Sequence, residues 1–333
     1  MLPISTEFLK RYVIVLIILT LLQVPVVAMQ FVGAKAGIIG TAGQTLGDSL
    51  GGTLGRNIKS GLMILCGTCM VFFWCRYILE GKSIFLFAGF SLILPLALVK
   101  ATYVLIPLVF AYIVVKNMFK SFRRISLLIA VVAIGIFINA TVFRTVEGWD
   151  IRRFFRKAEI EKYSMGTYGD EDRMGRMMAI ATANNLLMAQ DTHRWVFGLG
   201  PGIGSQSYFS SLSSDLEKFY KGIDSNQISS TILEMGYGGL VLLFFIYMSF
   251  FIGSLKLSKR FGDNFWKAVN EAFQCNVIIA ILLSGYTLVT IERDITAFVF
   301  WLFAAAVEKV SDEKKLMGSR SEKGRPLPGE SGL

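Results

Sequence analysis

Six basic side chains in and near one long polar segment are the residues best suited to chemistry. They are Lys100, Arg152, Arg153, Arg156, Arg173 and Arg176. A guanidinium keeps its charge at any relevant pH and binds phosphate oxygens through paired hydrogen bonds. The set therefore predicts a phosphorylated substrate. Arg173 and Arg176 share one face of a helix predicted from Asp170 to Gln190. The alternative for any one of the six is contact with lipid head groups or with acidic neighbours; Arg176 and Lys100 are the two that we favour as functional.

A second group of polar residues leads from this segment into an apolar helix. Asp224, Ser225 and Asn226 end the polar segment, and Glu234 follows about two turns inside the helix. An ionisable side chain in such a place is expensive to bury unless it is paired or faces a wet cavity, so Glu234 is a candidate site residue. A paired carboxylate near the membrane interface is the alternative interpretation.

Metal and nucleotide chemistry lack support in the sequence. No zinc-protease, serine-hydrolase or carboxylate metal motif is present. The glycines from Gly198 to Gly204 follow no strand of a βαβ unit, so they predict tight turns instead of a dinucleotide loop. From Asp191 to Gln227 we expect turns. Cys66 and Cys69 lie in an apolar run, where packing is a better account than metal or redox chemistry. We expect no metal and no cofactor.

The elements that position these residues are membrane helices. Hydrophobic residues make up 53% of the 333 positions and charged residues 17%, with a mean hydropathy of +0.56. A soluble domain carries about a quarter charged residues, whereas a bilayer absorbs about 20 apolar residues per spanning helix. The first apolar run ends without a cleavage site and is predicted to be retained as a helix. The sequence thus predicts an all-α, polytopic bundle with a large extracytoplasmic loop that contains short helices.

Eight transmembrane helices are expected, five before the large loop and three after it. They are predicted at 12–30, 59–79, 83–99, 101–115, 125–143, 229–254, 270–290 and 295–308. The uninterrupted run 84–115 is too long for one span at 1.5 Å per residue, so a hairpin at Lys100 divides it. The expected domains are 1–143 with the first five helices, 144–227 as the large loop, 228–309 with the last three helices, and 310–333 as a disordered cytoplasmic tail. Within the first domain, 31–58 is a Gly-rich external loop in which no stable helix is expected.

The charge distribution orients the chain. The segments between alternate apolar runs and at both ends hold 18 Lys and Arg against nine Asp and Glu, whereas the large loop holds 11 of each. This asymmetry is the positive-inside pattern and predicts that both termini are cytoplasmic. The net charge of +10 therefore reflects membrane orientation, and we expect no nucleic-acid partner.

The order of these motifs resembles that of the O-antigen ligase and polymerase superfamily. Its members typically place an arginine at the start of a helix in a large periplasmic loop, then an F-G-x-G-x-G turn. A segment with E-x-G-x-x-G follows at the start of the next membrane helix. The matching residues here are Arg176, the turn 197–202, Asn226, Glu234, Gly236 and Gly239, and Lys100 stands where a basic residue is typical at the outer end of a hairpin. The Gly-rich loop looks like that of exopolysaccharide-polymerising members, and the resemblance covers about residues 20–300.

The resemblance implies an envelope polysaccharide polymerase of O-antigen or exopolysaccharide biosynthesis, in the bacterial inner membrane. The donor would be an undecaprenyl-pyrophosphate-linked glycan. Further partners would be an acceptor glycan, membrane lipid, and chain-length regulator or export proteins. Arg176 and Lys100 would hold the pyrophosphate, and the acceptor hydroxyl would attack with inversion, with Asp224 or Glu234 as base. The other substrate contacts would be Arg152, Arg153, Arg156, Arg173, Ser225 and Asn226.

The sequence departs from the family pattern in two ways. Ser225 stands where ligases usually carry histidine, which favours a polymerase over a ligase that acts on a lipid core. Eight helices are predicted where the family usually has ten or more. A lipid or oligosaccharide transporter is a competing class, although no internal repeat is visible and the polar residues gather in one loop. A non-catalytic scaffold is a third.

Overall fold

The part of the chain that carries the fold is mostly helical. The computed structural model describes residues 5–35, 59–81, 85–86, 102–117, 126, 129–130, 133, 156–168, 173–203, 219–223, 225–258, 261–285 and 300–310. Most of the helices predicted at 83–99 and 125–143, of the Gly-rich loop and of the tail lies outside the described residues. The fold below is built from what remains.

Five long helices form the bundle. They are α1 (Thr6–Lys35), α2 (Lys59–Glu80), α4 (Thr102–Asn117), α11 (Gln227–Leu257) and α12 (Asn264–Leu283). Each of them overlaps a predicted helix. A further helical segment covers 300–310 and overlaps the last predicted helix, 295–308. The expectation of no helix from residue 31 onward is wrong for 31–35, because this stretch contains a single glycine and the backbone hydrogen bonds of α1 continue through it.

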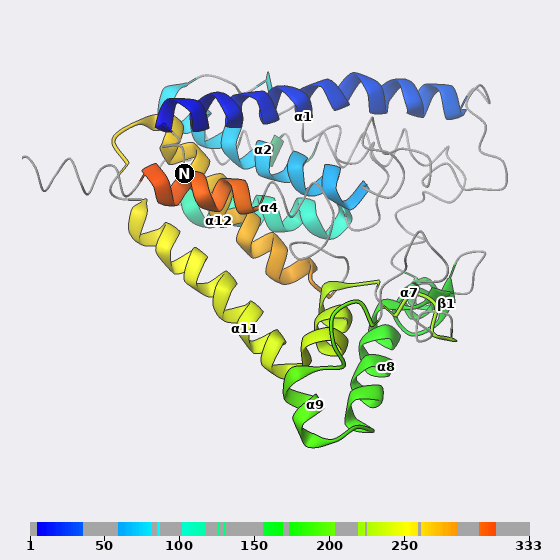
Figure 1. Cartoon of the computed structure of the whole chain (residues 1–333). Coiled ribbons are helices and arrows are strands. Elements are labelled where there is room, and N and C mark those ends of the chain that lie inside the picture. Colours follow the sequence, from blue (N-terminus) through cyan, green and yellow to red (C-terminus); the bar gives the residue numbers. More distant parts are fainter. Residues whose placement is uncertain are drawn as a thin grey trace, which may run out of the picture.

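Helix α12 lies at the centre of the bundle, packed against α2, α4 and α11 (Figure 1). It begins at Asp263, whose carboxylate accepts a hydrogen bond from the Phe265 amide at 2.9 Å and so caps the helix. Aromatic rings pack between α12 and its neighbours. Phe273 of α12 makes an edge-to-face contact with Phe250 of α11 and a tilted contact with Phe300. Most residues of α12, its polar side chains Asn270, Gln274 and Asn276 among them, are consequently buried.

Two helices in the described part are long and apolar enough to cross a membrane. They are residues Thr6–Gln30 of α1 and all of α11, Gln227–Leu257. Only 28% and 17% of their apolar windows are buried inside the protein. The core helix of a soluble protein would be mostly buried, whereas α11 exposes Val241, Phe244 and Phe245. These uncovered apolar faces are what a helix in lipid would present.

The large loop between the fifth and sixth predicted spans contains shorter elements. They are α7 (Lys157–Ser164), β1 (Thr167–Tyr168), β2 (Arg173–Met174), α8 (Arg176–Met188) and α9 (Thr192–Phe197). The strands pair antiparallel, and α8 and α9 pack on the start of α11. Figure 1 shows α8 and α9 at the start of α11, with α7 and β1 beside α8.

Two predictions for this loop are wrong. The helix expected over Asp170–Gln190 is wrong for Arg173 and Met174, because these residues form β2 and Arg173 pairs with Tyr168, and α8 begins at Arg176. Arg173 and Arg176 therefore do not share a helix face. The stretch after Asp191 is not all turn, since α9 begins at once with Asp191 as its N-cap. Six residues leave too short a periodic pattern to be recognised from sequence.

The helix ends that the charge pattern predicts to be cytoplasmic gather at the other end of the bundle. The Lys10 ammonium lies 5.4 Å from the ring centre of Phe265, so the start of α1 meets the start of α12. Lys116 at the end of α4 contacts Glu271 of α12. Ser258, just after α11, accepts a hydrogen bond from Asn270 at 2.9 Å. The pattern of basic residues and the packing thus agree on which helix ends lie together.

Candidate functional site

Arg176 is tied to the residues that precede α11 by hydrogen bonds in both directions. Its guanidinium Nη1 donates to the carbonyl oxygen of Ser225. In return, the Asn226 side-chain amide donates to the carbonyl oxygen of Arg176 at 3.2 Å. Three residues that the sequence singled out are therefore in direct contact, although Arg176 is 49 positions away from Ser225.

Asn226 also caps α11. Its Oδ1 accepts from the Ser229 amide at 2.9 Å, and its own carbonyl accepts from the Ser229 hydroxyl at 3.1 Å. The side chain is fully buried. A buried N-cap whose amide is also used to hold a neighbouring helix positions both helix starts at once. The start of α8, and with it Arg176, thus has a fixed place relative to the start of α11.

Helix α11 has a break at Gly236, and the Gly-rich turn after α9 forms hydrogen bonds to the helix at this break. Gly236 has φ 67° and ψ −167°, outside the helical region. An unbroken helix would use the Leu233 and Glu234 carbonyls for its own next turn. Here they accept hydrogen bonds from the amides of Leu199 at 2.7 Å and Gly200 at 3.2 Å. The turn therefore satisfies the backbone groups that the break frees.

Glycine is required where the two backbones meet. A Cβ on Gly198, which has φ 77°, would lie 2.5 Å from the Glu234 carbonyl oxygen. A Cβ on Gly236 would lie 2.5 Å from the Trp195 carbonyl oxygen. Neither approach is open to a residue with a side chain. The glycines of the F-G-x-G-x-G and E-x-G-x-x-G segments thus form one joint between the end of α9 and the break in α11.

The carboxylate of Glu234 points to this joint. Its Oε1 accepts a hydrogen bond from the Gly202 amide at 3.0 Å, and the residue is partly exposed. Glu234 lies two residues before the break. From Tyr237 to Leu257 the helix rises roughly 32 Å at 1.5 Å per residue, close to the ~30 Å of a hydrocarbon core. A membrane span of this length would leave Glu234 outside the hydrocarbon core, where a partly exposed carboxylate is tolerated.

A small apolar core supports the site. Ala183 and Leu187 of α8 pack against Ile223 before α11 and against Ile232 and Leu233 within it. The Tyr237 hydroxyl, just after the break, donates to the Asn184 side-chain oxygen of α8. We did not single out Asn184 or Tyr237 from the sequence. The position of Tyr237 between two motif glycines was a signal that could have found it.

Of the remaining predicted site residues, the structure describes only the position of Arg173 and Arg156. Arg173 lies in β2. Arg156 is the exposed residue before α7, without a capping bond from its side chain. Four further residues lie outside the described part, namely Lys100, Arg152, Arg153 and Asp224. Among the described residues, no group of three or more His, Cys, Asp or Glu side chains could hold a metal ion.

Comparison with known proteins adds no relative. The chain matches no family model, no curated protein sequence and no solved structure.

Proposed function

We propose that this protein is a membrane glycosyltransferase that polymerises an envelope polysaccharide from undecaprenyl-pyrophosphate-linked glycan. The observation that carries the proposal is the fixed Arg176 guanidinium beside Ser225 and Asn226. A guanidinium has five N–H donors in a planar fork, and the bond to Ser225 sets the plane of that fork. An arginine held in this way suits the terminal oxygens of a lipid pyrophosphate.

The reaction would consist of one displacement. An acceptor hydroxyl oxygen forms a bond to the anomeric carbon, and the bond from that carbon to the pyrophosphate oxygen breaks with inversion. Undecaprenyl pyrophosphate leaves with the electron pair, and Arg176 stabilises the charge that develops on it. A carboxylate accepts the hydroxyl proton. Glu234 is the described candidate because the Gly202 amide fixes one carboxylate oxygen, and Asp224 is the other candidate.

The proposed setting is the outer face of a bacterial inner membrane. We propose eight transmembrane helices with cytoplasmic termini, which puts α8, α9 and the start of α11 at the outer surface. Two observations support this arrangement: the length of α11 beyond Gly236, and the gathering of the basic helix ends at the opposite end of the bundle. A polyprenyl pyrophosphate would then have its phosphates at the level of Arg176.

Reconstitution separates the proposed function from its competitors. The purified full chain in liposomes is supplied with a synthetic undecaprenyl-pyrophosphate-linked oligosaccharide repeat. The expected result is a longer lipid-linked product, with released undecaprenyl pyrophosphate, in the absence of metal. Movement of the unchanged substrate to the other leaflet would identify a transporter. If neither elongation nor transport is seen with the repeat units of several envelope glycans, the scaffold is favoured and the proposal is overturned.

A further inference from the structure

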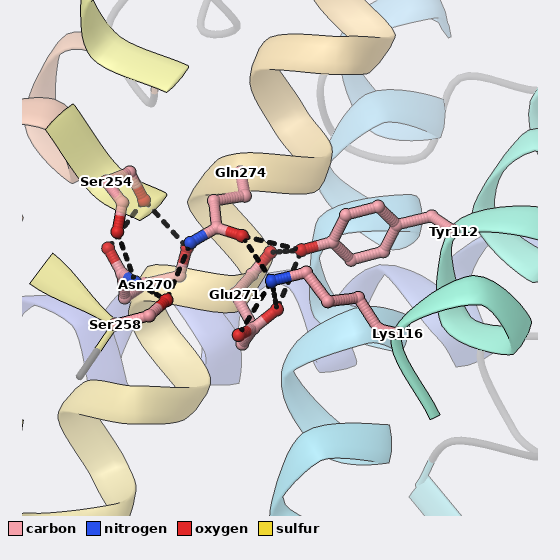
Figure 2. Close-up of polar contacts among 7 residues, drawn as sticks. All are labelled: Tyr112, Lys116, Ser254, Ser258, Asn270, Glu271 and Gln274. Carbon is pink, nitrogen blue, oxygen red and sulfur yellow. Dashed lines mark hydrogen bonds and ion pairs between the residues drawn. The ribbon is translucent and has the colours of Figure 1, made fainter. Parts of the chain in front are cut away.

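A polar network joins three helices at the end of the bundle opposite Arg176. Figure 2 shows its residues, which come from α4, α11 and the start of α12, with Ser258 just beyond α11. The Lys116 ammonium lies 3.0 Å from the Glu271 carboxylate, to which the Tyr112 hydroxyl also donates at 2.7 Å. Lys116 donates as well to the side-chain oxygen of Gln274 at 2.8 Å. Gln274 in turn donates to Ser258 at 2.9 Å.

This network forms one wall of a cavity of about 280 Å³. Trp74, Ile78 and Leu79 of α2 form an apolar wall, and Lys116, Lys267 and Glu271 form a charged one. The volume lies just below the ~300–1,000 Å³ of sites for drug-sized ligands. It therefore suits one head group rather than a whole glycan.

The charged wall carries an excess positive charge. Lys116 and Glu271 neutralise each other within 3.0 Å. Lys267 lies one helical turn before Glu271 on α12 and also lines the cavity. Within the described residues, its ammonium makes no ion pair or side-chain hydrogen bond. Lys267 is half-buried, and the three charged residues that line the cavity carry one positive charge in excess, which favours an anion beside them.

We propose that this cavity binds the phosphate group of an anionic ligand, with Lys267 as the ion-pairing residue. Two sources share this chemistry, a phospholipid head group and free phosphate. The apolar wall of α2 favours the lipid, because Leu79 is 39% exposed and would contact an acyl chain beside the phosphate. The charge pattern predicts that this end is cytoplasmic, where basic pockets between membrane helices take anionic head groups.

Native mass spectrometry of the purified full chain tests the site. The probes are phosphatidylglycerol, phosphatidylcholine as a lipid without net charge, and inorganic phosphate. The variant is Lys267→Gln, and the matched control is Lys256→Gln, an exposed lysine at the end of α11 that does not line the cavity. Both variants remove one positive charge from the same end of the bundle, so a diffuse charge effect would appear equally in both.

The expected result is a saturable phosphatidylglycerol complex that Lys267→Gln weakens about tenfold and Lys256→Gln by less than twofold. Phosphatidylcholine should bind at least tenfold more weakly to the wild type. Inorganic phosphate that binds alone, and is lost in Lys267→Gln, would support the site with free phosphate as its source. Equal binding of both anionic probes to wild type and Lys267→Gln would overturn the proposal. Thermal unfolding of each variant without ligand shows whether a loss reflects misfolding.

Discussion

The side-chain amide of Asn226 donates to the main-chain oxygen of Arg176 at 3.2 Å, while its Oδ1 caps α11 through the Ser229 amide. One fully buried side chain thus holds the starts of two helices. The Arg176 guanidinium in turn donates a hydrogen bond to the carbonyl oxygen of Ser225. The short segment before α11 is therefore both a helix cap and the support of the candidate catalytic arginine.

Asn226→Ala should destabilise the protein by about 1–3 kcal/mol, because it removes a helix cap and leaves the half-buried Arg176 carbonyl without this donor. Unfolding in mixed micelles measures the free energy. Asn226→Ser should recover part of the loss, since a hydroxyl can cap α11 but is too short to replace the second bond. Asn185→Ala, at an exposed position of α8, serves as the control and should change the stability little. A stable Asn226→Ala would contradict the role given to this residue.

Gly236→Ala should cost more than about 2 kcal/mol and reduce activity, because the new Cβ would meet the Trp195 carbonyl oxygen at 2.5 Å in a left-handed backbone conformation. Gly253→Ala lies on the same helix, where nothing stands within 4 Å of an added Cβ. This control should be neutral or stabilising by up to about 1 kcal/mol. The same mixed-micelle unfolding assay compares the two. Similar losses in the free energy of unfolding for both variants would mean that the joint between α9 and α11 does not require glycine.

Lys116 and Glu271 should be energetically coupled. In a double-mutant cycle with Lys116→Met and Glu271→Gln, we expect a coupling free energy of about 1–2 kcal/mol. Each single change leaves the other, partly buried charge without its ion-pair partner. The exposed pair of Glu7 and Arg11 is the comparison and should show less than about 0.5 kcal/mol. Coupling at Lys116 and Glu271 no larger than at this exposed pair would argue against a structural network.

Single cysteines test the orientation of the chain. Met165→Cys, 62% exposed in the large loop, should react in intact cells with a maleimide that does not cross membranes. Lys256→Cys, at the opposite end of α11, should react only after the cells are opened. The parent chain is the background control, with Cys66, Cys69 and Cys275 buried. The reverse pattern of labelling would invert the proposed topology and remove Arg176 from the outer face.

The sequence predicted the positions of the long helices better than the contacts between the segments of the candidate site. Apolar runs located α1, α2, α4, α11 and α12 because burial and span length leave a strong periodic signal. Arg176 and Asn226, which the order of motifs assigned to one site, are in direct contact, and their role in catalysis stays a prediction. The order of motifs could not show that the glycines of two motifs meet backbone to backbone, since that contact depends on tertiary packing.

The errors have local causes. Arg173 was assigned to a helix because acidic residues preceded it, yet Gly175 and the pairing with β1 delay the helix by several residues. The network around Glu271 was missed, although Lys267, Asn270 and Gln274 place polar side chains at one-turn spacing along α12, with Glu271 beside them. Its partners Tyr112 and Lys116 are more than 150 positions away, and no local pattern reveals such a contact.

The glycan profile of cells that carry Arg176→Ala in place of the wild-type chain tests the central claim most directly. Arg194→Ala, an exposed arginine of α9 that bonds only locally to Gln190 among the described residues, is the matched control. At equal protein levels, we predict loss of long envelope glycan chains in Arg176→Ala, a partial loss in Arg176→Lys, which keeps the charge but not the fork, and a normal ladder in Arg194→Ala. A normal chain-length ladder in Arg176→Ala would contradict the account.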